Sequence, residues 1–173
     1  MSPDDLLRDA CIAWCLSEVR GDVRRVLVDA AVACVLAGER SSAVAAVAGL
    51  TASASWSEVD LLVAEVVRTS GIRVPEPGSA EAVRASLRVA VLPLAREVGS
   101  GARPPGELVA LVGASWGADD DSELAELRRL AVRDEVLRGV AEEHGEDDVL
   151  LRERADIDAA VVEAARALVA RLA

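Results

Sequence analysis

Three cysteines and one histidine are the side chains in this sequence best suited to chemistry. Cys11 and Cys15 are four residues apart, so a helix would place them on one face, and Cys34 falls on the next predicted helix. With His144 they would complete the Cys3His set that zinc accepts, and on their own they could work as a redox pair. All three cysteines lie among Ala, Val, Ile and Leu, where a cysteine packs like a small hydrophobe. We therefore expect core packing and keep the redox and metal roles as alternatives.

His144 stands in an acidic stretch near the end of a predicted helix, directly after Glu142 and Glu143. A histidine in that setting is typical of an exposed helix end, and a metal-binding or pH-sensitive role is the alternative. Since the chain has no second histidine, a di-iron site built from two Glu-x-x-His motifs is excluded.

The residue types that are missing limit the chemistry further. The chain has no Lys, Asn, Gln, Tyr or Phe, which removes the lysine that forms Schiff bases, the tyrosine acid and the amides that orient substrates. No Gly-x-Ser-x-Gly motif marks a hydrolase nucleophile. We expect a protein that is not an enzyme and needs no cofactor, with the thiol chemistry above as the alternative.

The balance of charge is strongly acidic, with a formal net charge of −11 and an isoelectric point near 4.6. A negative surface repels phosphate groups, so nucleic acids and anionic membranes are poor partners. The first residues lack the basic and apolar regions of a signal peptide, and the longest apolar runs are about half of the ~20 residues that span a bilayer. These features predict a cytoplasmic protein with reduced thiols.

One segment, 45–59, resembles part of a helix-turn-helix motif, with Ala45 and Gly49 four residues apart as in many repressors. The resemblance implies DNA binding. The helix that would enter the groove, 56–67, contains no Arg and carries three acidic residues. Phosphates would repel such a helix, so we expect no nucleic acid partner.

Two tryptophans and a pair of arginines are the remaining candidates for binding. Trp56 and Trp116 are predicted where a loop meets a helix, a position from which an indole can line a groove or an interface. Arg128 and Arg129 form one basic group, and the arginines at 20–25 form another, so an anion pocket between the two groups is an alternative. Surface ion pairs with nearby carboxylates are the simpler explanation for these arginines.

Helical periodicity runs through nearly the whole chain, and no segment alternates as a strand would. Ser55 and Ser79 are predicted N-caps, as is either Ser41 or Ser42, and Ser55 opens a Ser-x-x-Glu capping box. Gly21 is predicted to end the first helix. The predicted helices cover residues 4–19, 23–37, 43–50, 56–70, 80–98 with a kink near Pro93, 107–116, a stretch after 121 that ends near 143, and 148–172.

Aromatic residues are only 2% of the chain, so the core must be built from Ala, Val and Leu. The helix that ends near 143 is predicted to bury Leu124, Leu127, Val132 and Leu137. The sequence therefore predicts an all-α fold of seven to nine helices, as a single domain 1–173. Any subdivision is expected at the Gly- and Pro-rich segment 99–106.

Three functional hypotheses follow from a chain rich in packing residues and poor in catalytic ones. The first is a non-catalytic interaction or regulatory protein that binds a protein partner, or a second copy of itself, through helix faces. The second is a thiol redox or metal-dependent activity that uses Cys11, Cys15 and Cys34. The third is a helical pocket for a small apolar or anionic ligand.

Overall fold

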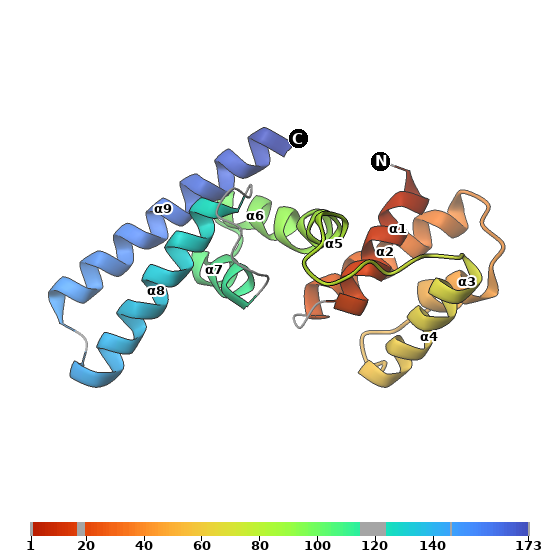
Figure 1. Cartoon of the computed structure of the whole chain (residues 1–173), viewed down its shortest axis with the longest axis horizontal. Coiled ribbons are helices and arrows are strands. Elements are labelled where there is room, and N and C mark those ends of the chain that lie inside the picture. The colour runs from red at the N-terminus through yellow and green to blue at the C-terminus, as the bar shows by residue number, and fades with distance from the viewer. Residues whose placement is uncertain (1, 17–19, 115–123, 146, 173) are drawn as a thin grey trace. The chain divides into compact units, whose positions relative to one another are not determined.

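The computed structural model describes residues 2–16, 20–114, 124–145 and 147–172, and it confirms the prediction of an all-α fold (Figure 1). Within these residues the chain forms nine α-helices, at the upper end of the predicted number, and one π-helical turn. In chain order they are α1 Pro3–Leu16, α2 Arg20–Leu36, α3 Ser42–Ala48, α4 Trp56–Thr69, α5 Ala80–Ser86, the π-helical turn η1 Leu87–Val91, α6 Leu92–Gly99, α7 Pro105–Ala114, α8 Ala125–His144 and α9 Asp148–Leu172.

The chain divides into two compact units, 1–90 and 91–173. The division falls inside η1, whereas the segment 99–106, where a subdivision was expected, lies within the second unit. The prediction that both units belong to one domain stays a prediction.

Serine caps begin three of the helices as the sequence predicts. The hydroxyl of Ser55 accepts a hydrogen bond from the Glu58 amide at 3.2 Å, and Ser41 and Ser79 accept in the same way at the starts of α3 and α5. These bonds satisfy amides that have no partner in the first turn of a helix. Because Trp56 is the first residue of α4, the Ser55 cap also fixes where this indole is presented.

Gly21 does not end a helix, and that prediction is wrong. It is the second residue of α2, which begins at Arg20. The helix buries Val23, Leu27 and Ala30, and this packing outweighs the cost of about 1 kcal/mol of one glycine in a helix.

The irregularity predicted near Pro93 takes the form of a π-helical turn. The turn η1 ends at Val91, and Pro93 then lies in the first turn of α6. Proline lacks an amide hydrogen and its ring crowds the preceding turn of an α-helix. The wider π-helical turn directly before Pro93 accommodates both effects.

The first unit is organised around α1, which packs against α2, α4 and α5. Its core includes the fully buried Ile12, Trp14 and Leu27 together with Val63 of α4. As expected from the composition, most core positions hold Ala, Val or Leu. Short side chains of this kind let helices approach closely, and they bury modest area per residue.

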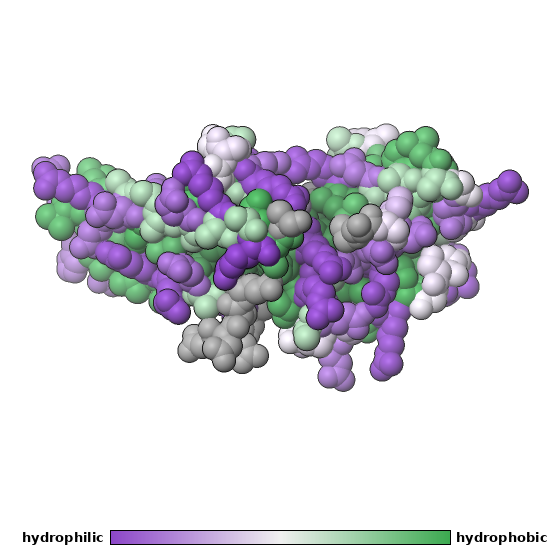
Figure 2. Space-filling view, turned by 90° about the horizontal axis from the view of Figure 1, so that it is seen from above, coloured by the Kyte–Doolittle hydropathy of each residue, from purple (hydrophilic) through white to green (hydrophobic). Residues whose placement is uncertain are grey.

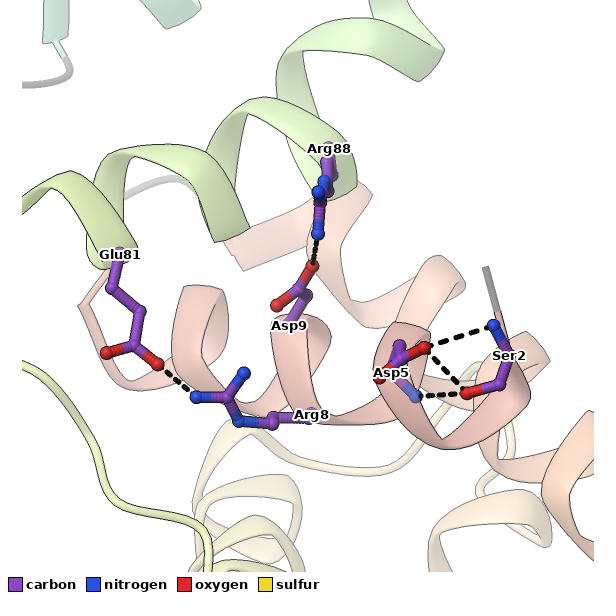
Figure 3. A network of polar contacts seen from close by, with 6 residues as sticks. All are labelled: Ser2, Asp5, Arg8, Asp9, Glu81 and Arg88. Atoms are coloured by element: carbon purple, nitrogen blue, oxygen red, sulfur yellow. Dashed lines mark hydrogen bonds and ion pairs between the residues drawn. The ribbon is translucent and has the colours of Figure 1, made fainter.

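Polar contacts fasten α5 and η1 to α1 (Figure 3). The guanidinium of Arg88 donates to the carboxylate of Asp9 at 3.0 Å, and Arg8 forms an ion pair with Glu81, which lies seven residues before Arg88 in the first turn of α5. The Asp9 side chain is only 9% exposed, whereas Arg8 and Glu81 are both about half exposed. The Asp9–Arg88 pair therefore has the greater consequence, because a buried carboxylate needs a charged or hydrogen-bonding partner.

In the second unit α9 contacts α6, α7 and α8, and α8 and α9 lie side by side in Figure 1. One face of α9 buries Ile157, Val161, Ala165 and Leu168, which is the spacing of a helix with a single core face. The close approach of α9 to α6 uses Gly99, since a Cβ there would lie 3.2 Å from Cγ of Arg166. None of the described helices has both the length and the apolar character that crossing a bilayer requires.

The Asp9–Arg88 pair yields a test of these energetics. We expect Arg88→Met to lower the free energy of unfolding by about 1–3 kcal/mol, because the buried Asp9 carboxylate loses its charged donor. The matched control is Arg8→Met, which removes an exposed pair and should cost less than about 1 kcal/mol. Urea unfolding of both variants measures the difference, and equal losses would contradict the importance of burial.

Candidate functional site

The three cysteines lie in the first unit, and none of them is in a disulfide. Cys11 and Cys34 are buried among aliphatic side chains, while Cys15, one turn after Cys11 on α1, is exposed. The Sγ of Cys34 donates to Oδ1 of Asp4 at 3.5 Å. Cys34 also lies near enough to Cys11 to act electrostatically on that thiol.

Burial acts against thiolate chemistry at these positions. Desolvation raises the pKa of the Cys11 thiol to about 12, and the nearby Cys15 and Cys34 add to the effect. Desolvation also raises the pKa of Cys34 to about 11, supported by the hydrogen bond to Asp4. Redox and metal-binding cysteines act as thiolates, so this environment favours the packing role for both residues.

His144 is the last residue of α8, in the second unit, and it is exposed. Its Nε2 lies 3.8 Å from a carboxylate oxygen of Glu143. Among the described residues, no three His, Cys, Asp or Glu side chains are grouped so that they could hold a metal ion. The metal hypothesis for Cys11, Cys15, Cys34 and His144 therefore gains no support from the geometry of this part of the chain.

Trp56 belongs to a cluster that ties α1, α2 and α4 together. Its ring is 5.7 Å from that of the buried Trp14, centroid to centroid, at 33° between the planes. Nε1 of Trp14 donates to Oδ1 of Asp60 at 2.8 Å, and the guanidinium of Arg24 lies 5.7 Å from the Trp56 centroid. Half of Trp56 remains exposed, so it is both a packing residue and a surface feature, as its place at a loop–helix junction predicts.

A hollow of about 320 Å³ lies beside this cluster, lined by Arg24, Arg25 and the 50–52 segment. Arg24 donates to the backbone carbonyl of Ala54 at 3.1 Å and to that of Thr51. These bonds, together with the stacking on Trp56, assign Arg24 the role of holding the 49–55 loop against α2. A ligand bound in this hollow would lie next to the Arg24 guanidinium, which already donates hydrogen bonds to the Ala54 and Thr51 carbonyls.

The other predicted binding residues lie on or before α8. Arg129 is exposed and Arg128 is half-buried, and Arg129 borders a hollow of about 310 Å³ between α8 and α9 that is also lined by Glu126 and Arg171. Trp116 lies outside the described residues. The two arginine groups belong to different units, and an anion pocket between them stays a prediction.

An apolar stripe on the outer face of α8, formed by Val132, Val136 and Val140, was not anticipated. These side chains are 61%, 60% and 37% exposed. The prediction that Val132 is buried is wrong, because the core face of α8 carries Leu127, Ala131 and Asp134. Figure 2 shows hydrophobic residues, in green, interspersed with hydrophilic ones on the surface of the molecule.

The spacing in the sequence contains the signal for this stripe. Val132, Val136 and Val140 are separated by four residues each, and Leu127, Ala131 and Asp134 follow the same helical spacing half a turn away. The predicted set of Leu127, Val132 and Leu137 is spaced by five residues, which no single helix face accommodates. The sequence of α8 therefore indicates two separate helix faces, one with the three valines and one with Leu127, Ala131 and Asp134.

Comparison with known protein families, with curated proteins and with solved structures found no match for this chain.

The raised thiol pKa values predict how stability depends on pH. The unfolded chain releases thiol protons near pH 9, whereas the folded chain holds those of Cys11 and Cys34 until about pH 12 and 11. Stability should therefore fall as pH rises above 9, and these thiols should add no slope below it. The chain has no Lys or Tyr, so few other groups titrate in this window.

Urea unfolding at pH values from about 8 to about 11 measures this slope. The slope should shrink in Cys11→Ala and in Cys34→Ala, each compared with its own value at pH 8. It should persist in the control Cys15→Ala, because Cys15 is exposed. A slope that is the same in all three variants would show that the buried thiols do not carry it.

Proposed function

We propose that this protein is a non-catalytic interaction protein, located in the cytoplasm, that binds a polypeptide through the valine stripe of α8. The observation that carries the proposal is the regular exposure of Val132, Val136 and Val140, one valine on each of three successive turns of one helix. Isolated exposed hydrophobic residues are common on soluble proteins, whereas a continuous apolar stripe marks an interaction surface. The stripe from Val132 to Val140 is long enough to pack against one helix of a partner.

The chemistry of the rest of the chain is consistent with a binding role. The buried thiols are held protonated, and the described residues bring no three metal-ligating groups together. The negative net charge of −11 opposes a nucleic acid or an anionic membrane as the partner. A protein partner needs neither reactive groups nor a positive surface.

The two alternatives stay predictions with less support. A thiol activity would need Cys11 or Cys34 to ionise against the effect of burial. A small-ligand site would use the hollow beside Arg24 and Arg25, where Arg24 is bound to the loop carbonyls. Neither feature is as regular as the stripe on α8.

A photoreactive amino acid in place of Val136 tests the proposal in the producing cells. We expect a covalent adduct with a polypeptide that mass spectrometry identifies and that, once purified, binds the wild-type chain. Val132→Asp should abolish this binding, because a carboxylate cannot be buried in an apolar contact without a partner. The matched control carries the photoreactive residue at Asp158, an exposed position on α9.

The result that would overturn the proposal is equally specific. If the probe at Val136 gives no polypeptide adduct beyond that of the Asp158 control, the stripe binds no protein under those conditions. If it reacts within its own chain, the stripe is covered by another part of the same molecule. Either outcome removes the basis for the proposed function.

A further inference from the structure

We propose that the occupant of the valine stripe is the α8 stripe of a second copy of this chain, packed antiparallel about a two-fold axis at Val136. This inference rests on the proposed function and names the partner. It is carried by the charges that border the stripe at either end. Arg129 lies seven residues before Val136 and Glu143 lies seven residues after it, and both side chains are exposed.

Helix geometry places these two residues on the same face as the valines. Seven residues correspond to nearly two full turns, so Arg129 and Glu143 deviate by only about 20° from the direction of Val136. Each lies about 10 Å from Val136 along the axis. The stripe therefore has an apolar centre, a cation at one end and an anion at the other.

In an antiparallel pair of α8 helices centred on Val136, every valine of the stripe lies beside a valine and each end charge lies beside an opposite charge. Val132 of one copy lies beside Val140 of the other, and Val136 meets its own equivalent. Arg129 of each copy lies against Glu143 of the other, giving two ion pairs. A parallel pair would instead bring arginine against arginine and glutamate against glutamate, which is unfavourable.

Gly139 fits the same arrangement. It lies on the side of the stripe occupied by Val132, so the two-fold axis brings Val132 of the other copy over it. A glycine inside a helix costs about 1 kcal/mol relative to alanine, and none of the described residues lies within 4 Å of the position where its Cβ would be. Packing within the described part of the chain does not require this glycine, whereas a close approach by a second helix would use it.

The contact is isologous, so it closes after two copies. One helix per copy gives an interface at the small end of the range for specific complexes. We therefore expect a reversible dimer with a dissociation constant on the order of micromolar.

Charge reversal at the two ends gives the decisive experiment, with sedimentation measured over a range of concentrations of the full chain. Arg129→Glu alone and Glu143→Arg alone should each weaken dimerisation roughly tenfold, because two attractive pairs become repulsive. The double variant R129E/E143R should recover it. These residues are about 21 Å apart along one helix, so the recovery can only arise between copies.

A mixture of the two single variants sharpens the test. Arg129→Glu and Glu143→Arg each repel their own kind, but together they form complementary pairs at both ends and should associate as a heterodimer. The charge-matched control is Glu142→Arg, an exposed position on α8 outside the stripe, which should leave dimerisation within about twofold of wild type. Circular dichroism of each variant establishes that the helices are retained.

The outcomes separate the two proposals. The second-copy proposal is overturned if the wild-type chain stays monomeric at a protein concentration roughly a hundred times the expected dissociation constant. It is also overturned if neither charge reversal changes the dissociation constant of the dimer. If the probe at Val136 at the same time binds a different, identified polypeptide through the stripe, the proposed function stands without it. A dimer that follows the charge-reversal pattern supports both.

Discussion

The short aliphatic core is the constraint on which the rest of this structure depends. With aromatic residues at 2% of the chain, the helices must be held by Ala, Val and Leu, which gain their free energy through many close contacts of small area each. A helix packed in this way buries only a narrow face, and its side chains outside that face are exposed to solvent. The valines of α8 are exposed for this reason, because α9 and α7 take up the opposite face of the helix.

Because the core is built from short aliphatic residues, the few buried polar groups have a larger effect on how the helices pack. Asp9 is held by Arg88 between α1 and η1, and Trp14 donates to Asp60 between α1 and α4. A small-residue core has little excess free energy with which to offset an unpaired polar group. These pairs therefore specify which helix faces meet, and the aliphatic contacts around them supply most of the stability.

Local signals in the sequence predicted local structure well. Serine caps at positions 41, 55 and 79 form the expected hydrogen bonds, since a cap depends on a few adjacent residues. The prediction for Gly21 is wrong because α2 as a whole packs against α1 and α3, and the tendency of a single glycine to end a helix does not include that packing. The burial of Cys11 and Cys34 follows from their aliphatic neighbours, but the raised pKa of each thiol depends on packing that only the structure shows.

The composition rich in Ala, Val and Leu made the helical fold easy to predict. The same composition made the valine stripe of α8 difficult to recognise as a candidate site. In α8 apolar residues occupy two opposite faces, so hydrophobicity alone does not distinguish the core face from the exposed one. A monomer gains nothing from valine at 132, 136 and 140, because β-branched residues form helices less well than alanine, arginine or glutamate do. Exposed valines also leave apolar area in water that charged side chains would not. The free energy that these residues cost the isolated chain is recovered only when another surface covers them, and the opposite charges at the two ends of the stripe limit which surfaces can do so.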